Sequence, residues 1–244
     1  METLSLVSLN IEKRRHIGRF IPFLQREQAD VVCLQELADI DVPQIEKILG
    51  MKGVFAPMTH IVGTADNQSF ISGIGIFSRL PIVEQTPIYY IGSAHKIPEY
   101  TSQNVNTVNY VLLGVKVVKN NQEFSVATTH FTWSPDGKLS PAQMQNLPKL
   151  LESMSQLGEC VITGDFNTPR GGDAFAELAE KYHDNIPAEI KTTLDGNLHR
   201  AGPIERMVDG LFTTPGYSAS DVKIVCGISD HCAVVAKLSL AQSL

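Results

Sequence analysis

The sequence has no long hydrophobic run and no basic block, and each absence removes a class of protein. No stretch of about eighteen consecutive apolar residues occurs, so we expect no membrane-spanning helix. The chain starts without a basic segment leading into an apolar one, which argues against a secretory signal and predicts a cytoplasmic protein. The formal net charge of -6 limits any wide basic surface of the kind that follows long polyanions.

The cysteines are few, and none has the Cys-x-x-Cys spacing typical of structural zinc sites. All four lie within or beside apolar, strand-like segments: Cys33, Cys160, Cys226 and Cys232. Free cysteine behaves as a small buried hydrophobe, so we predict buried free thiols rather than disulfides or zinc ligands.

The chain also lacks low-complexity linkers and short repeats, and its 43% hydrophobic content is ample for one core. We therefore predict a single domain over residues 1–244. Apolar segments rich in Val, Ile, Leu and Thr predict about ten strands, and three or four helices are grouped rather than strictly alternating with them. Two sheets between outer helices, an α/β fold, accommodate this order best. The long polar connections are predicted at Gly92–Asn106 and Thr132–Ser140.

A faint repetition links the two halves of the chain. A helical pattern over Arg15–Gln28 precedes an apolar segment that ends in an acid, and a second over Ser140–Leu157 does the same. In the second helix Ser140 and Gln143 form a predicted capping box, and Met144, Leu147, Leu151 and Met154 form the predicted buried stripe. The repetition predicts two similar lobes packed face to face.

Several strand-like segments end in residues suited to phosphate and divalent-metal chemistry. They are Leu4–Asn10, Val31–Glu36, Phe124–His130, Cys160–Asn167 and Ile228–His231, with Met207–Phe212 carrying Asp209 in a similar setting. Carboxylates and imidazoles are costly to bury without partners, so their convergence at one rim indicates a functional site.

The metal-ligand candidates from the residues themselves are Glu36 and Asn10. A hard cation such as Mg²⁺ takes oxygen ligands, and a glutamate with an amide oxygen forms a plausible minimal site. By strand alternation Gln35 should point away from Glu36. The alternative for Glu36 alone is a salt bridge, and Lys13, Arg14 and Arg15 either reach the site or begin a solvated helix.

The remaining candidates supply acid, base and hydrogen-bonding groups. Asp165 can take a proton from water or orient it, and Asn167 can donate to a phosphoryl oxygen, although the same motif also forms Asx-turns. His231 can act as base, acid or cation, with Asp209 as the group that orients it. His130 can donate to phosphate, and Trp133 either packs on a substrate ring or covers the core edge.

Together these motifs resemble the endonuclease/exonuclease/phosphatase superfamily, and the likeness extends from residue 8 to residue 231. The motifs are SLN (8–10), LQE (34–36), SGIGIFSRLPI (72–82), TTH (128–130), GDFN (164–167), VDGLF (208–212) and SDH (229–231). The resemblance implies a four-layered α/β/β/α sandwich with two packed mixed sheets and pseudo-two-fold lobes. It also implies Asn10, Glu36 and Asp230 at the metal, and His130, Asp165, Asn167, Asp209 and His231 in catalysis.

By that resemblance we expect a Mg²⁺- or Mn²⁺-dependent hydrolase of phosphoesters that acts through an activated water. Whether Asp165 or His231 removes the proton stays open at this level. The acidic composition favours a small-molecule or broad phosphodiester substrate, with a DNA or RNA nuclease as the alternative. A catalytically silent binding scaffold is the remaining alternative, and no obligate protein partner is expected.

Overall fold

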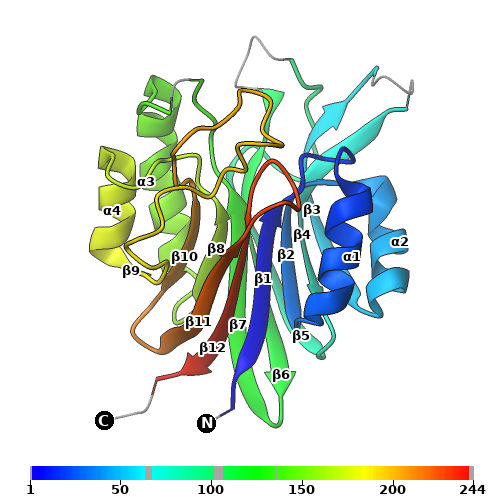
Figure 1. The fold of residues 1–244 in the computed structure, drawn as a ribbon, viewed down its shortest axis with the longest axis vertical. Helices are drawn as coiled ribbons and strands as arrows, with labels where there is room; N and C mark the ends of the chain where they lie inside the picture. Colours follow the sequence, from blue (N-terminus) through cyan, green and yellow to red (C-terminus); the bar gives the residue numbers. More distant parts are fainter. Residues whose placement is uncertain (1, 64–67, 102–106, 136, 242–244) are drawn as a thin grey trace.

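Two mixed β-sheets pack face to face between two pairs of helices, giving a four-layer α/β/β/α sandwich (Figure 1). The computed structural model describes residues 2–63, 68–101, 107–135 and 137–241. Parts of the two predicted connections, residues 102–106 and 136, lie outside the described residues. Within the described residues, no helix is both long and apolar enough to span a bilayer.

The first sheet combines the two ends of the chain. It contains β1 (Leu4–Asn10), β2 (Val31–Ala38), β3 (Lys52–Ile61), β4 (Phe70–Ser78), β11 (Tyr217–Val225) and β12 (Ala233–Leu240), in the order β11-β12-β1-β2-β4-β3. Its outer face is covered by α1 (Ile17–Glu27) and α2 (Val42–Leu49), and a 3₁₀ turn, Asp39–Asp41, leads into α2. Phe20, Phe23 and Ile45 pack there against strand residues such as Val7 and Val32.

The second sheet is formed by the middle of the chain. It contains β5 (Ile82–Ile91), β6 (Tyr110–Lys119), β7 (Gln122–His130), β8 (Val161–Asp165), β9 (His183–Asp184) and β10 (Asp209–Thr213), in the order β5-β6-β7-β8-β10-β9. The helices α3 (Pro141–Ser155) and α4 (Asp173–Lys181) lie on its outer side (Figure 1). The capping box of Ser140 and Gln143 is present at the start of α3, as predicted.

The two sheets share one plan. Among the described strands each sheet has a single parallel pairing, β1 with β2 and β7 with β8, and its other pairings are antiparallel. In each parallel pair one outer helix lies between the two strands in the sequence, α1 between β1 and β2 and α3 between β7 and β8. The predicted two-lobed sandwich is therefore confirmed.

The space between the sheets changes from apolar to polar toward one end. Apolar residues such as Leu6, Cys33 and Ile162 fill most of it. Closer to the carboxyl ends of the parallel strands, Gln35 donates through Nε2 to Thr128 Oγ1 at 2.9 Å and joins the two sheets. This polar layer lies under the ends of the strands that carry the predicted site residues.

Two sequence-based predictions are wrong. Cys226 and Cys232 form a disulfide, whereas Cys33 and Cys160 are buried free thiols as predicted. Val225 and Ala233 are the last paired residues of β11 and β12 on the side of the connecting loop. Cys226 follows Val225 and Cys232 precedes Ala233, so the two cysteines face each other at the end of the hairpin. Met144 is 53% exposed, because α3 buries Leu150 beside Leu147 instead.

Candidate active site

The carboxyl ends of the four parallel strands meet at one edge of the sandwich. Asn10 ends β1, His130 ends β7 and Asp165 ends β8, while Glu36 lies near the end of β2. Asn10 Nδ2 donates to Asp165 Oδ2 at 3.0 Å, which links the first sheet to the second. Both side chains are almost fully buried. Residues 155 positions apart in the sequence are thus in direct contact.

A bulge in β2 places Glu36. The pairing of β2 with β4 shifts register between Leu34 and Leu37, and Glu36 has a φ of 54°, in the left-handed region. Gln35 points between the sheets, where it donates to Thr128. The register shift interrupts the strand alternation on which the predicted opposite orientation of Gln35 and Glu36 rests, so that orientation stays a prediction. The Glu36 carboxylate is near enough to His130 and His231 for their charges to lower its pKa. The bulge therefore turns an acid toward residues of both sheets.

A tight turn after β8 holds Asp165. Asn167 donates from its backbone N–H to Asp165 Oδ1 at 2.8 Å, and its side-chain Nδ2 donates to the Phe131 carbonyl at 2.9 Å. The motif is thus an Asx-turn as well as a cluster of candidate residues. His130 Nε2 lies 3.5 Å from Asp165 Oδ2, so this oxygen faces both Asn10 and His130.

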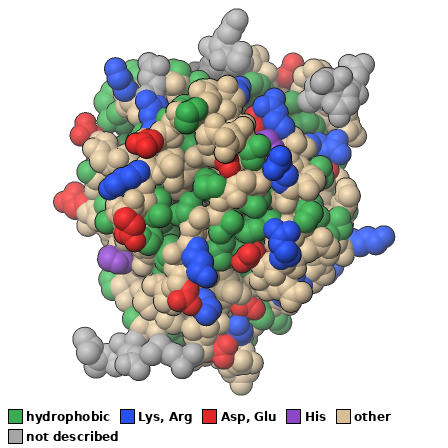
Figure 2. Space-filling model, in the orientation of Figure 1, with side chains coloured by type: hydrophobic (Ala, Val, Ile, Leu, Met, Phe, Trp, Pro, Cys, Tyr) green, Lys and Arg blue, Asp and Glu red, His purple; other side chains and the backbone are tan. Residues whose placement is uncertain are grey.

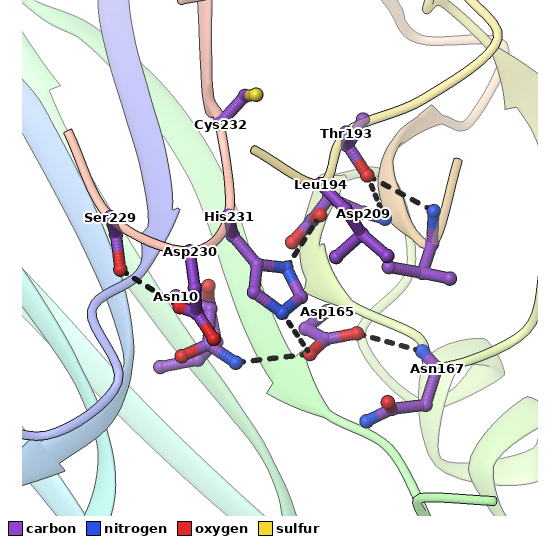
Figure 3. A network of polar contacts seen from close by, with 12 residues as sticks. Asn10, Asp165, Asn167, Thr193, Leu194, Asp209, Ser229, Asp230, His231 and Cys232 are labelled. Carbon is purple, nitrogen blue, oxygen red and sulfur yellow. Dashed lines mark hydrogen bonds and ion pairs between the residues drawn. The ribbon is translucent and has the colours of Figure 1, made fainter. Parts of the chain in front are cut away.

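His231 lies between two carboxylates (Figure 3). Its Nδ1 is 2.9 Å from Asp209 Oδ2, and its Nε2 is 3.7 Å from Asp165 Oδ2. Burial opposes the charge on the imidazole, but Asp209 and Asp165 outweigh it and raise the pKa of His231 well above its usual value. The two carboxylates therefore favour the protonated form of the imidazole beside Asp165.

A segment that the sequence reasoning missed supports this arrangement. Thr193 Oγ1 accepts from the backbone N–H groups of Val208 and Asp209, and its carbonyl accepts from Cys232 N at 2.7 Å. Asp195 N donates to the Asp230 carbonyl at 2.8 Å (Figure 3 shows Thr193 above Asp209). The sequence offers no sign of this role, because Thr193–Asp195 lies in a polar connection with no motif.

Candidate ligands for a cation form groups on both sides of the site. Asp230 is buried, and its Oδ1 accepts from Ser229 Oγ at 3.0 Å. Its ligand oxygen also lies within 4.8 Å of ligand atoms on Glu12 and His16, two residues that sequence reasoning did not select. A second group with the same spacing is Asp165, Asp209 and His231. Carboxylate oxygens suit hard divalent cations.

The three consecutive basic residues after β1 pair with three different carboxylates. Lys13 Nζ lies 2.5 Å from Glu36 Oε2, whereas Arg14 pairs with Asp41 and Arg15 with Glu12. Burial opposes ionisation of Glu36, but Lys13 leads the charges that lower its pKa to about 2. Burial likewise opposes the charge on Lys13, and Glu36 raises its pKa. The Glu36 site thus attracts and holds a positive charge, which fits a cation site.

Trp133 does not seal the core. Its side chain is 52% exposed, in the loop that follows β7, and the neighbouring Phe131 is fully buried in its place. Two roles were possible for Trp133, and one of them, covering the edge of the core, is taken by Phe131 instead. The indole remains available to a ligand.

The layered fold with polar strand ends places the chain in a recognisable structural class. An endonuclease/exonuclease/phosphatase from Beutenbergia cavernae DSM 12333 has a TM-score of 0.75 at 17% identity, covering 99% of this chain and 72% of that one. The human Nocturnin catalytic domain with bound sulfate anion has a TM-score of 0.70 at 16% identity, covering 98% and 95%. D. rerio TDP2 complexed with single strand DNA product has a TM-score of 0.71 at 17% identity, covering 98% and 100%.

The chain belongs to the Endonuclease/Exonuclease/phosphatase family, whose model matches residues 7–231. No curated protein matches the chain at the sequence level. At 13–17% identity the solved structures establish the fold alone. The family includes nucleases and phosphatases and is generally hydrolytic on phosphoesters.

Proposed function

We propose that this protein is a divalent-metal-dependent hydrolase of phosphoester bonds. The observation that carries the proposal is the convergence of acids, amides and imidazoles from both sheets on one edge. Asn10, Glu36, Asp230 and His231 come from the first-sheet side, and His130, Asp165, Asn167 and Asp209 from the second. A binding scaffold has no physical need for so many buried, mutually repelling carboxylates.

The residues of the first-sheet side fit a Mg²⁺ or Mn²⁺ ion. Glu36 and Asp230 supply carboxylate oxygens, and Asn10 Oδ1, which accepts from Glu12 N at 3.1 Å, retains a second lone pair. When bound, such an ion polarises a phosphoryl oxygen and offsets developing negative charge. The ion pair of the Lys13 ammonium with Glu36 supports a cation at this position.

The second-sheet side carries the proton chemistry. We assign Asp165 as the base that orients and deprotonates the attacking water, because its Oδ2 faces both imidazoles, while Asp209 and Asp165 favour the protonated form of His231. The His231 imidazolium and His130 then stabilise negative charge on the phosphoryl oxygens. Asn167, fixed by Phe131, positions the turn beside them.

The surface favours a small or short phosphoester as the substrate. On the described part of the face in Figure 2, basic side chains lie among acidic ones and form no continuous basic stripe. Nucleic acid is the second candidate. It is supported by exposed Trp133, which can stack on a base, and by the single strand DNA product bound to the TDP2 neighbour.

The test is an activity screen with Mg²⁺, Mn²⁺ or chelator. Substrates are a chromogenic phosphodiester, inositol phosphates, sphingomyelin, abasic DNA and RNA. We expect metal-dependent release of product from at least one substrate and none with chelator or with Asp165→Asn. Full activity in chelator contradicts the metal assignment. Calorimetry that finds no divalent-ion binding, together with no cleavage, supports the silent scaffold instead.

A further inference from the structure

The ion pair of Lys13 with Glu36 is formed at the expense of favourable backbone conformations. Eight non-glycine residues in the described chain have positive φ. Gln28 caps α1, Asn120 and Asn121 turn the β6–β7 hairpin, and Asp221 lies at a bulge in β11. The other four, Glu12, Lys13, Glu36 and Asn167, lie in or beside the candidate active site.

Two of these four residues, Lys13 and Glu36, meet in one contact, and a third, Glu12, directly precedes Lys13. Glu12 and Lys13 have φ values of 45° and 60°, and Glu36 has a φ of 54°. Conformations of this kind are rare for residues with a Cβ and persist where surrounding structure enforces them, commonly at functional sites. Here both partners of one ion pair have left-handed backbones, and the result is the 2.5 Å contact between Lys13 Nζ and Glu36 Oε2.

Lys13 also differs from the two arginines that follow it. Arg14 is engaged with Asp41 and Gln68, and Arg15 with Glu12, away from Glu36. Lys13 alone of this run directs its charge at the carboxylate that the proposed function gives to the metal. The Lys13 side chain is 38% exposed, so its flexible stem has room to leave.

We propose that Lys13 is a tethered competitor of the divalent cation at Glu36. The ammonium satisfies Glu36 Oε2 when no metal is bound. A divalent cation binding the same carboxylate is repelled by the ammonium at close range, so binding of the metal favours displacement of Lys13. The affinity for metal is thereby lowered by the cost of breaking the ion pair. This inference rests on the proposed function, because it uses Glu36 as a metal ligand.

The test measures Mn²⁺ affinity from the electron paramagnetic resonance signal of free Mn²⁺, without any substrate. We expect Lys13→Met to bind Mn²⁺ about tenfold more tightly than wild type, since both the competing ion pair and a nearby positive charge are removed. Lys116→Met is the matched control. Lys116 pairs with Glu84 and Glu123 on exposed strands, and its loss should leave the Kd unchanged.

A double variant locates the competition. In a Glu36→Gln background, Lys13→Met should give a clearly smaller gain in Mn²⁺ affinity, because the carboxylate for which the two cations compete is absent and only the charge repulsion is relieved. An equal or weaker Mn²⁺ affinity in Lys13→Met overturns the inference, as does an unchanged gain in the Glu36→Gln background. Folding of each variant is checked by circular dichroism, and Lys13→Gln replaces Lys13→Met if the latter does not fold.

The two proposals fail differently. If wild type binds no Mn²⁺ and cleaves no phosphoester, the proposed function fails. If wild type binds Mn²⁺ and Lys13→Met binds it equally, only the role of Lys13 fails.

Discussion

The two sheets place an acid at equivalent ends of their parallel strands by different means. In the second sheet Asp165 lies in regular register, opposite His130. In the first sheet the residue opposite Asn10 is Gln35, and the acid, Glu36, comes one residue later with a left-handed backbone. Gln35 is thereby free to join the sheets through Thr128. In the proposed function, one topology thus serves two tasks, with Glu36 at the metal and Asp165 at the proton.

The strongest test of this division removes each acid in turn. Glu36→Ala and Asp165→Ala should each lower turnover by about 10²- to 10³-fold, the usual cost of losing one preorganised charged group, and His231→Ala should do the same. Turnover under excess Mg²⁺ measures the effect, with Lys116→Met as a control. Wild-type turnover in any one of the three excludes that residue from the site. Of the three variants, only Glu36→Ala should also weaken Mn²⁺ binding strongly, and this difference separates the metal task from the proton task.

Stability offers a second test, at the glycine before Asp165. Gly164 has a φ of 140°, and a Cβ there would lie 2.1 Å from the Thr129 carbonyl oxygen. Gly164→Ala should therefore lower the free energy of unfolding by about 3 kcal/mol. Gly18→Ala is the control, since Gly18 is exposed in α1 with nothing near its Cβ position and should gain up to about 1 kcal/mol. Equal urea midpoints for the two variants contradict the packing argument.

The Cys226–Cys232 disulfide stabilises the first sheet and has no counterpart among the described residues of the second. It closes the loop between β11 and β12 that carries Asp230 and His231. Reduction should lower the free energy of unfolding by about 2 kcal/mol, the low end of the usual range because the loop is short. Melting with and without dithiothreitol measures this, and Cys226→Ser should show no response to the reductant. If the wild type melts at the same temperature with and without dithiothreitol, the disulfide does not stabilise the fold and this prediction is wrong.

The smallest effect is expected at the opposite end of the sandwich, where Asp30 links the sheets. Its Oδ2 accepts from Ser5 N, Ser5 Oγ and Lys119 Nζ, each at 2.8 Å. Burial alone would raise the pKa of Asp30, but Lys119 and Ser5 outweigh it and hold the pKa below its usual value. The stabilisation is therefore present above the unfolded pKa, near pH 4, and is lost as the pH falls through the folded pKa.

Asp30→Asn should accordingly cost about 1 kcal/mol at pH 7 and less at pH 3. Urea unfolding at the two pH values gives both numbers. A difference between variant and wild type that stays constant with pH contradicts this role of the Asp30 charge.

The sequence predicts elements with strong local signals and misses those fixed by distant contacts. The predicted strand-like segments Leu4–Asn10 and Phe124–His130 match β1 and nearly all of β7, and the capping box marks the start of α3. The helix α2, Val42–Leu49, is missed because eight residues are too few for its apolar periodicity to stand out from a loop. The Cys226–Cys232 bridge depends on hairpin register, which no local pattern reveals.

The candidate site shows the same limit. Strand-final polar residues identify Asn10, Glu36, His130 and Asp165, because strand ends meet at one edge of a sheet. The left-handed backbone at Glu12 and Lys13 has no signature in the residue types, and Lys13 therefore reads equally as the start of a solvated helix. Thr193, which orders Asp209 and the loop of His231, is likewise visible only in three dimensions.

The most direct test of the account is the anomalous diffraction of crystals grown with Mn²⁺. A metal site on the first-sheet side predicts a peak about 2.0–2.6 Å from carboxylate oxygens of Glu36 and Asp230, with Lys13 Nζ moved off Glu36. A peak elsewhere, or Lys13 still paired with Glu36 at full Mn²⁺ occupancy, would contradict it.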